Sequence, residues 1–478
     1  MNDLEAVFYF RSQSIAVSYL IDTVSGMDTS SKVPRQPRRS GPLVSHTGEV
    51  LSRSVTFQFA LDPTLEQRTL FAKCAGARRF TFNHHLARVK ENLDVRSSER
   101  TETREPTTPS LSWSKFSFIN EFNAWKNGQL DDSPEQEDGT KGLHWRHEIP
   151  ESVFECASAD ASQALANWSD SEKGQRRGAT VGFPRFAAKN RATPSFRLRN
   201  RAAPGTTQVI RFSDANHLHL PKIGEVKVLG PTRQVRRMLE AGRFHVYSAT
   251  LTQRGGRWLV SLTGVAAQFH PQRRSLRDRH QSPVGVDRGI TSLAVCADAD
   301  ADGSFFTAFE GVRELRNAEQ RLIAAQKALA RTTPGSKGRE KARSRLNRRH
   351  RQVALTRRHL VHQASSYLVT HCATLVLEDL NVAGMAKNRS LAKSIHDAAM
   401  GELARQITYK AQWYGARVIL ADRFFASSKT CSGCGEVKSE LSLSSRVYVC
   451  SHCDLSIDRD HNAAINLARW TPALSATT

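Results

Sequence analysis

The sequence predicts a multidomain α+β protein, and three observations support this fold class. The chain has 478 residues, a length typical of about three domains. An alternating run at 55–61 predicts a strand, and short alternating runs that recur between 205 and 270 predict a small β-barrel. From residue 283 onward, buried strands alternate with long helices, which indicates a domain that combines a sheet with covering helices.

Between the two strand-rich regions, the chain is predicted to be mostly helical. Apolar residues recur at helical spacing from Glu66 onward, and again over 113–126 and 151–169. Two polar segments, 95–110 and 131–138, interrupt these helices and are expected to be loops. The predicted organisation up to residue 270 is therefore a β-barrel accompanied by a group of helices.

The second half of the chain carries the short apolar runs that are typical of buried strands. These strands are expected at 284–287, 293–296, 304–309, 374–378 and 418–420. Two long helices, 312–331 and 339–370, are predicted on either side of a turn that contains proline and glycine. Leu403 and Ile407 mark the apolar face of another helix.

The formal net charge of +23 favours a polyanionic partner. Residues 172–201 hold nine basic side chains and one acidic, and residues 331–358 hold eleven basic and one acidic. Where surface charge serves solubility alone, acidic and basic residues are usually interspersed. The two runs therefore indicate nucleic acid, although each is also compatible with a solvated basic face. No apolar run approaches the roughly 18 residues of a membrane-spanning helix, so no membrane partner is expected.

Aromatic side chains are interspersed with the cations of the first basic run. Phe183, Phe186 and Phe196 lie within it. Cations contact phosphates while rings stack on bases, so this mixture is typical of a surface that binds single-stranded or bent nucleic acid.

The eight cysteines fall into two groups. Four are isolated in mostly apolar surroundings and are expected to be reduced core thiols, as in a reducing compartment: Cys74, Cys156, Cys296 and Cys372. The others form two Cys-x2-Cys pairs separated by fifteen residues: Cys431, Cys434, Cys450 and Cys453. This spacing predicts a zinc ribbon in which four thiolates fill the tetrahedral shell of one structural Zn²⁺. Four unrelated thiols or two disulfides are the alternative.

Three acidic residues stand at the edges of buried elements. Asp287 and Glu378 each end an apolar strand, and Asp460 precedes an apolar helix that includes Asn462. Three such carboxylates can bind two Mg²⁺ ions, and paired metals support phosphodiester hydrolysis. Aspartate is also common at helix N-caps, so Asp460 could instead cap its helix. The 17 histidines are scattered, and most are expected at the surface or facing nucleic acid.

The C-terminal part resembles the RuvC-type nuclease domain of TnpB proteins and compact type V CRISPR effector nucleases. The matching motifs, in order, are GVDRGI (285–290), LEDL (377–380), SSKTCSGCG (427–435) and DRDHNAA (458–464). A looser similarity in the N-terminal half extends the resemblance over roughly 55–470. Two features depart from the family pattern. The first fifty residues are atypical, and Arg288 stands where many relatives have a small or apolar residue. Arg288 is not expected to touch the metal site.

The resemblance implies that Asp287, Glu378 and Asp460 are the catalytic ligands of two Mg²⁺ ions. It selects Asp460 rather than Asp458, because the family's acid lies two residues before the asparagine, here Asn462. No second nuclease module of the HNH kind is visible in the sequence. A single RuvC site would therefore cut both DNA strands in turn.

The resemblance also implies the order of the domains. The N-terminal extension is expected to be partly disordered. A wedge β-barrel follows, with a helical recognition lobe inserted between its strands. The last domain is an RNase-H-like RuvC domain that carries a helical hairpin and the zinc ribbon. The expected ranges are 1–50 for the extension, 51–61 and 205–270 for the barrel, 62–204 for the lobe, 271–282 for a linker, 283–425 and 458–470 for the RuvC domain, 426–457 for the ribbon and 471–478 for the tail.

The activity implied by the resemblance is that of an RNA-guided DNA endonuclease. A guide RNA would pair with double-stranded target DNA, while the protein would read a short flanking motif and the shape of the backbone. The residues expected to contact nucleic acid are Arg78, Arg79, Arg185, Lys189, Arg197, Arg199, Lys341, Arg345, Arg348 and Arg349.

Two other functions are compatible with the same sequence. The chain could be an RNA-guided DNA binder that does not cut, or a zinc-ribbon DNA-binding accessory protein of transposition. The sequence does not distinguish a CRISPR effector from a transposon-encoded protein, or a monomer on the RNA from a homodimer. The N-terminus lacks the pattern of a signal peptide, so a prokaryotic cytoplasmic, nucleoid-associated location is expected.

Overall fold

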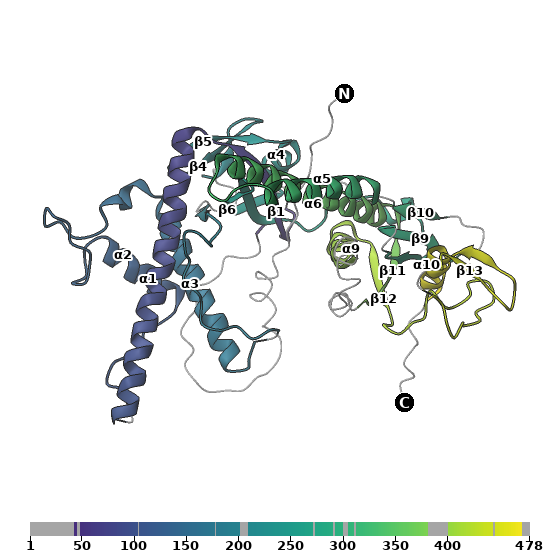
Figure 1. The fold of residues 1–478 in the computed structure, drawn as a ribbon, viewed down its shortest axis with the longest axis horizontal. Coiled ribbons are helices and arrows are strands. Elements are labelled where there is room, and N and C mark those ends of the chain that lie inside the picture. The colour runs from purple at the N-terminus through teal and green to yellow at the C-terminus, as the bar shows by residue number, and fades with distance from the viewer. Residues whose placement is uncertain are drawn as a thin grey trace. The chain divides into compact units, whose positions relative to one another are not determined.

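The computed structural model shows two compact units that divide between Ala267 and Gln268. Figure 1 shows the fold. The structure describes residues 43–44, 48–103, 105–176, 178–200, 209–270, 273–289, 292–299, 305–309, 312–380, 400–442 and 445–470. The expectation of disorder in the N-terminal extension therefore falls almost entirely outside the described residues.

The N-terminal unit contains a seven-stranded antiparallel sheet. Its strands are β1 (Leu51–Asp62), β2 (Ser195–Arg199), β3 (Arg211–Phe212), β4 (His217–Leu220), β5 (Gly224–Leu229), β6 (Phe244–Arg254) and β7 (Arg257–Ala267). Hydrogen bonds join them in the order β2-β6-β7-β1-β5-β4-β3. The strands expected at 55–61 and within 205–270 are thus confirmed, while closure of the sheet into a barrel stays a prediction.

Strand β2 corrects two expectations from the sequence. It falls inside the range assigned to the helical lobe, yet it pairs with β6 along its whole length. The second part of the sheet therefore begins at Ser195 rather than at residue 205. The alternating pattern of β2 also points Phe196 into the core, where its ring lies 5.8 Å from Phe71 and 6.2 Å from Trp258. Phe196 is only 2% exposed and cannot stack on a base.

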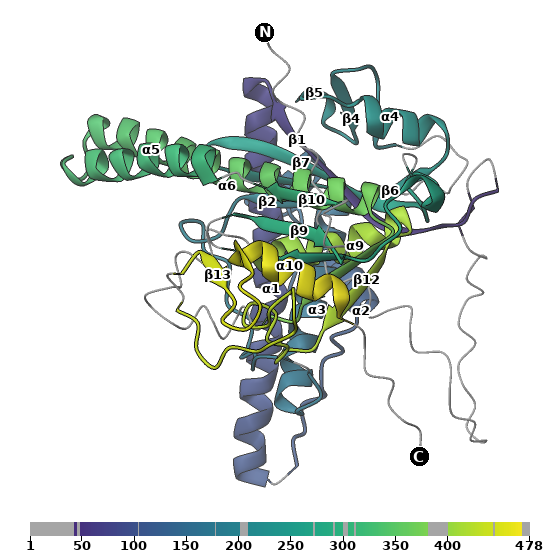
Figure 2. The same ribbon diagram turned by 90° about the vertical axis from the view of Figure 1, so that its right-hand side faces the viewer.

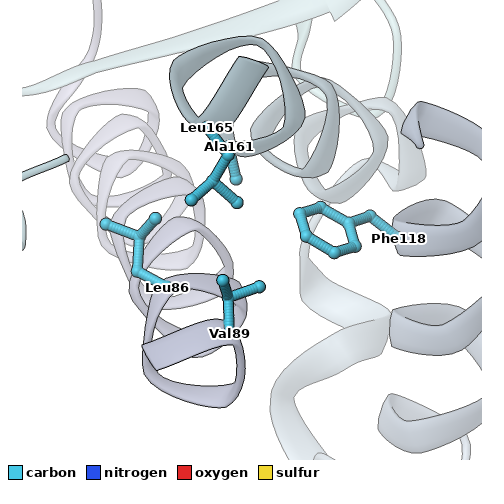
Figure 3. Close-up of a cluster of buried hydrophobic side chains, with 5 residues drawn as sticks. All are labelled: Leu86, Val89, Phe118, Ala161 and Leu165. Carbon is cyan, nitrogen blue, oxygen red and sulfur yellow. The ribbon is translucent and has the colours of Figure 1, made fainter. Parts of the chain in front are cut away.

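Helices make up the other regular structure described in the N-terminal unit. They are α1 (Leu65–Thr103), α2 (Lys115–Lys126), the 3₁₀ helix η2 (His144–Glu148), α3 (Glu151–Glu172) and the short α4 (Arg233–Glu240). Leu86 and Val89 of α1 meet Phe118 of α2 and Ala161 and Leu165 of α3, as Figure 3 shows. The helices predicted from the apolar spacing are therefore confirmed.

The loop expected over 95–110 is wrong for its first half, because α1 continues to Thr103. Four of the polar residues there are good helix formers: Arg96, Glu99, Arg100 and Glu102. Glu99 also binds the chain that folds back beside the helix, because it accepts a hydrogen bond of 2.9 Å from the backbone N–H of Thr108. Earlier in α1, Asn92 donates one of 3.0 Å to the carbonyl of Pro109. These bonds replace solvent contacts along the last turns of α1.

The C-terminal unit is built on a five-stranded mixed sheet with the order β10-β9-β8-β11-β12. Its elements are η3 (Leu276–Asp278), β8 (Val284–Asp287), β9 (Ala294–Asp298), β10 (Phe306–Phe309), α5 (Val312–Ala330), α6 (Lys337–His371), β11 (Thr374–Glu378), α9 (Met400–Tyr414), β12 (Arg417–Ala421), β13 (Val447–Val449), β14 (Ser456–Asp458) and α10 (Arg459–Arg469). Strands β8, β11 and β12 are parallel, whereas β9 and β10 are antiparallel to their neighbours. All five strands expected from the sequence are present.

Helices cover both faces of this sheet. Helix α10 lies on one face and α9 on the other, as the two views in Figures 1 and 2 agree. Helix α10 crosses β8 at Gly285, where a Cβ atom would lie 1.9 Å from the carbonyl oxygen of Ala464 and 2.6 Å from the nitrogen of Ala468. Only glycine permits this approach of a helix backbone to a strand.

The two long predicted helices, α5 and α6, form an antiparallel pair in Figure 2. Leu315 and Ala318 of α5 pack against Val353 of α6, and Arg357 forms an ion pair of 3.3 Å with Glu319. Much of the remaining surface of α6 is basic. Among the helices that the structure describes, we find none that is long and apolar enough to cross a membrane.

The packing of α10 on β8 predicts that Gly285→Ala destabilises the C-terminal unit. The added methyl group would overlap backbone atoms that cannot move independently, so we expect a loss of at least about 2 kcal/mol in the free energy of unfolding. Thermal or urea unfolding measures this loss. Gly338→Ala is the matched control, because its methyl group would meet only the Ser336 hydroxyl at 3.7 Å. Equal stability of the two variants would contradict the prediction.

Candidate functional site

Two of the three predicted acids lie side by side at one edge of the C-terminal sheet. Asp287 is the last residue of β8, and Glu378 is the last residue of β11. The two strands are parallel neighbours, with Leu377 opposite Val286 in the register. The carboxyl ends of parallel strands meet at the same edge, so the next residue of each strand brings its carboxylate to one place.

The third acid reaches this edge from the helix that crosses the sheet. Asp460 lies in the first turn of α10. A Cβ atom built on Gly289, two residues after Asp287, would lie 3.6 Å from Oδ2 of Asp460. The close crossing at Gly285 therefore delivers Asp460 to the end of β8.

The electrostatics of Asp287 show how closely the three acids approach one another. Burial raises the pKa of Asp287 well above its usual range, and the neighbouring carboxylates of Glu378 and Asp460 raise it further. Arg459 and Arg288 act in the opposite direction. Three carboxylates with this mutual repulsion form a site that positive charge would stabilise.

Asp458 and Asp460 have different structural roles. Asp458 is the N-cap of α10, and its side chain accepts hydrogen bonds of 3.0 Å from the backbone N–H groups of Asp460 and His461. Asp460 makes no cap, so the alternative that it merely caps its helix is wrong. Burial and the charge of Asp458 raise the pKa of Asp460, while Arg446 and Arg459 lower it.

Glu378 is held at both its backbone and its side chain. The Ser427 hydroxyl donates a hydrogen bond to Oε1 of Glu378. Arg288 donates to the backbone carbonyl of Glu378 and, at 3.1 Å, to that of Met400. Arg288 therefore lies beside the acids through the Glu378 backbone, while the expectation that it does not touch the metal site stays a prediction. Its side chain folds inward because buried carbonyl groups offer it partners, and it is only 5% exposed.

The donor chemistry of the acids fits Mg²⁺, which prefers carboxylate oxygens. The three carboxylates are spread more widely than a single-ion site. Among the described residues, the four clustered cysteines are the one set of at least three His, Cys, Asp or Glu whose ligand atoms all lie within 4.8 Å of one another.

The four clustered cysteines converge as the sequence predicts. The Sγ atoms of Cys431 and Cys453 are 3.6 Å apart, as are those of Cys434 and Cys450. A tetrahedral zinc site with Zn–S bonds of about 2.3 Å places its sulfurs about 3.8 Å apart, whereas a disulfide requires about 2.05 Å. The disulfide alternative is therefore wrong, and the arrangement fits one zinc ion.

The four isolated cysteines are buried and unpaired, which confirms the prediction of core thiols. Burial raises the pKa of Cys74 and of Cys372 to about 12, so these thiols stay protonated. Their environment is unlike that of the cluster, where a backbone N–H of His452 points at the sulfur of Cys450 at 3.4 Å. Hydrogen bonds of this kind lower the pKa of the Cys450 thiol.

Two asparagines fasten the ribbon to the helix that carries Asp460. Asn462 accepts a hydrogen bond of 2.8 Å from the backbone N–H of Ser432 and donates one of 2.7 Å to the carbonyl of Thr430. Asn466, one turn later, donates at 2.8 Å to the carbonyl of Ser427. Both side chains are almost fully buried. The first cysteine knuckle and α10 are thus one hydrogen-bonded assembly.

Sequence reasoning identified the acids and cysteines but assigned no role to Ser427, Asn462 or Asn466. The asparagines carried a signal, because two amides spaced by four residues interrupt an otherwise apolar helix face and require buried partners. Ser427 carried no such signal. Its role depends on the path of the chain after β12.

Three of the predicted nucleic-acid contacts lie against acidic residues of α3. Arg78 and Arg197 both pair with Asp160, the former at 3.4 Å, and Arg199 lies 3.8 Å from Glu155. These ion pairs give the three arginines a structural role in joining α1, α3 and β2. Contact of these three arginines with nucleic acid stays a prediction.

Other predicted contacts are presented to solvent. Arg185, Lys189, Lys341, Arg345 and Arg348 are exposed, and Arg79 and Arg349 are half-buried. The segment that carries Arg185 and Lys189 is fixed to α1, since Asn83 exchanges two hydrogen bonds with the backbone of Ala187, at 2.8 and 3.2 Å. The same segment exposes Phe186, whereas Phe183 packs against Trp168 in the helical core.

The expected surface position is wrong for several histidines. His85 stacks on Phe118 with ring centroids 4.2 Å apart, and His84 lies 4.2 Å from Trp125. Burial lowers the pKa of His84 to about 4 and that of His85 to about 3, so both rings are neutral. These histidines belong to the aromatic core between α1 and α2.

Three family models match this chain. A Cas12f1-like TNB domain matches residues 401–467, a "Probable transposase" model named OrfB_IS605 matches 271–389, and a helix-turn-helix model of the same name matches 54–96. The last segment is folded here as β1 followed by the single long helix α1. The first two models together span the acids, the basic hairpin and the ribbon.

Relatives and a solved structure resemble most of the chain. "Putative RNA-guided DNA endonuclease Rv2885c" of Mycobacterium tuberculosis (strain ATCC 25618 / H37Rv) is 32% identical over 87% of this chain and 86% of its own length. InsQ of Escherichia coli (strain K12), which has the same description, is 26% identical over 87% and 92%. A cryo-EM structure of a Cas12f1–sgRNA–target DNA complex has the same fold, with a TM-score of 0.50 and 11% identity over 88% of this chain and 99% of that one.

The sequence similarity over most of both chains assigns this protein to a family. The chain belongs to the TnpB and compact type V effector family, as its motifs predict. The fold is accordingly the multidomain fold of a compact type V protein.

The cysteine geometry predicts that Cys431→Ser removes the bound zinc. Loss of one of four ligands should reduce the zinc content from about one ion per chain towards zero and lower the melting temperature of the C-terminal unit by roughly 5 °C or more. Elemental analysis and thermal unfolding measure the two effects. Ser451→Ala, an exposed position in the second knuckle, is the control. Full zinc content in Cys431→Ser would contradict the assignment.

The buried position of Arg288 predicts that Arg288→Met destabilises the C-terminal unit. The substitution leaves the carbonyls of Glu378 and Met400 without these donors, at a cost of about 3 kcal/mol. Urea unfolding compares this variant with Arg345→Met on α6, where the arginine is exposed and little change is expected. If both variants unfold alike, Arg288 does not brace the acid cluster.

Proposed function

We propose that this protein is an RNA-guided DNA endonuclease with a single RuvC-type active site. The observation that carries the proposal is the convergence of Asp287, Glu378 and Asp460 at one sheet edge, from three elements far apart in sequence. Membership of a family whose relatives are described as RNA-guided DNA endonucleases supports it.

Asp287, Glu378 and Asp460 would hold two Mg²⁺ ions through their carboxylate oxygens. When bound, such ions activate a water molecule and stabilise the leaving oxygen of a phosphodiester. The protein's own contribution is rigidity. Ser427 fixes the direction of the Glu378 carboxylate, and Arg288 fixes its backbone. The cap formed by Asp458 holds the first turn of α10, and with it Asp460.

The ribbon would carry one structural Zn²⁺ rather than a catalytic ion. Four thiolates complete a tetrahedral shell and leave no position for water. Its contribution to function would be indirect, because Asn462 and Asn466 tie the first knuckle to the helix of Asp460. Folding of the ribbon would therefore stabilise the nuclease site beside it.

The remaining parts of the chain would bind the nucleic acids. In this proposal, the sheet and helices of the N-terminal unit form the wedge and recognition lobe, and the exposed cations of 182–190 and of α6 contact RNA or DNA backbones. A guide RNA would pair with one strand of the target, and the protein would read only a short flanking motif. One active site would cut the two strands in turn.

The acid assignment predicts that substitutions at Asp460 and Asp458, two residues apart, have very different effects on the rate of DNA cleavage. Asp287→Ala and Asp460→Asn should each reduce Mg²⁺-dependent cleavage of a guide-matched DNA duplex by at least about 100-fold. Binding of RNA and DNA should be nearly unchanged. Asp458→Asn is the control, since asparagine caps helices as well as aspartate does, and it should cleave at close to the wild-type rate. Cleavage rates and filter binding with the co-purified RNA give both readouts.

The same assay separates the proposal from the two alternatives. A guided binder that does not cut would bind the matched duplex without any Mg²⁺-dependent cleavage in the wild-type protein. A zinc-ribbon accessory protein would retain specific DNA binding after RNase treatment. Undiminished cleavage by Asp287→Ala would show that the catalytic site lies elsewhere. Sequencing the co-purified RNA would then distinguish repeat-derived from transposon-end guides.

A further inference from the structure

An exposed phenylalanine stands beside the acid cluster and has no role in the site described so far. Phe424 follows β12, the strand that pairs with β11 on the side away from β8. Ala421, the last residue of β12, is opposite Glu378 in the register. Phe424 is three residues further on, a stretch of chain that spans at most about 11 Å. Its backbone therefore lies close to the catalytic edge of the sheet.

The turn that carries Phe424 is held by hydrogen bonds and by packing. Asp422 accepts a hydrogen bond of 2.8 Å from the backbone N–H of Phe424 at its side chain, and one of 3.1 Å from that of Phe425 at its carbonyl. Phe425 packs into the core formed by Val376, Leu467 and their neighbours. One ring of the pair is thus anchored, and the other is directed away from the core.

The turn is also joined to both acidic residues at the end of β11. Arg423 pairs with Asp379, with N–O distances of 2.6 and 3.1 Å, and Ser427 donates to Glu378. Residues on both sides of Phe424 are therefore fixed to the strand that supplies a catalytic carboxylate. A nucleic acid bound at the acid cluster would therefore lie at a fixed position relative to Phe424.

Phe424 itself is 89% exposed, the highest value among the exposed large apolar side chains of the described residues. A flexible loop could hide such a ring by moving, but this turn is constrained on both sides. Single exposed apolar residues need no explanation by themselves. Phe424 differs from such residues because it is held at the edge of the proposed nuclease site. Holding an exposed ring in one position does not stabilise the fold, so the fold alone does not account for it.

We propose that Phe424 stacks on a base of the DNA strand that enters the nuclease site. The inference rests on the proposed function and deepens it by naming a substrate contact. Every base has an aromatic face, so stacking is tolerant of sequence, as guided cleavage requires. The surroundings favour a nucleic acid over an apolar protein surface, because the ring adjoins charged groups and Arg446 and Arg459 supply positive charge near Asp460. The ring would hold an unpaired base while the acids engage the adjacent phosphodiester.

The test uses full-length protein with its co-purified RNA and three variants, Phe424→Ala, Phe424→Leu and Phe424→Trp. Under single-turnover conditions with a guide-matched duplex, Phe424→Ala and Phe424→Leu should each cleave about tenfold more slowly, the effect of losing one stacked base. Phe424→Trp should cleave at the wild-type rate or faster. Melting temperature, zinc content and the affinity for target DNA should not change. Leu420→Ala, which removes a 55% exposed apolar side chain from β12 itself, is the matched control.

A second readout locates the contact. The target strand carries 2-aminopurine near the cleavage position, and the protein carries Asp287→Ala so that the DNA is not cut. The 2-aminopurine fluorescence should fall when this variant, which keeps Phe424, binds the DNA. It should stay high with the double variant that also carries Phe424→Ala. Wild-type cleavage rates in Phe424→Leu, or unchanged quenching in Phe424→Ala, would overturn the inference. A change of oligomeric state in Phe424→Ala would assign the ring to a protein interface instead. If the wild-type complex does not cleave at all, the proposed function fails first, so the two failures are distinguishable.

Discussion

The architecture of the site depends on one close packing contact, the crossing of α10 over β8 at Gly285. Two of the acids are on neighbouring parallel strands and would adjoin in any sheet with this order. The third is on a helix near the C-terminus, and it reaches them only because the α10 backbone approaches β8 within a distance that excludes any side chain at position 285. The same helix carries the asparagines that hold the ribbon. A glycine without chemical function thus positions both the acids and the ribbon.

Gathering three carboxylates carries an electrostatic cost, and the surrounding residues are arranged to meet part of it. The repulsion is visible in the raised pKa of Asp287, where the charges of Glu378 and Asp460 add to the effect of burial. The positive charges of Arg288 and Arg459 lower that pKa, and Arg288 also donates a hydrogen bond to the backbone carbonyl of Glu378. A positive charge bound among the three carboxylates would reduce their repulsion further.

The N-terminal unit shows why basic residues are harder to assign than acids or cysteines. Arg78 and Arg197 share Asp160, so part of the apparent positive charge is neutralised within the fold. Phe196 lies in an aromatic core although the residues on either side of it are polar or basic. A run of cations and rings has the same composition whether it forms a strand of a sheet or a binding surface. Only the partners across the sheet and on α3 distinguish these outcomes.

The sequence by itself determined the features that are encoded locally or by strict spacing. The strands and helices of the C-terminal unit, the four-cysteine cluster, the three strand-end and helix-start acids and the family all follow from apolar periodicity and motifs. The tertiary structure decided what depends on residues distant in the chain. It assigned Asp458 to a cap and Asp460 to the acid cluster, turned Arg288 inward to the Glu378 carbonyl, buried His85, and placed β2 in the sheet. In each case a buried or paired polar group finds its partner in a part of the chain that is distant in sequence. The local sequence does not contain that partner, so it could not predict the outcome.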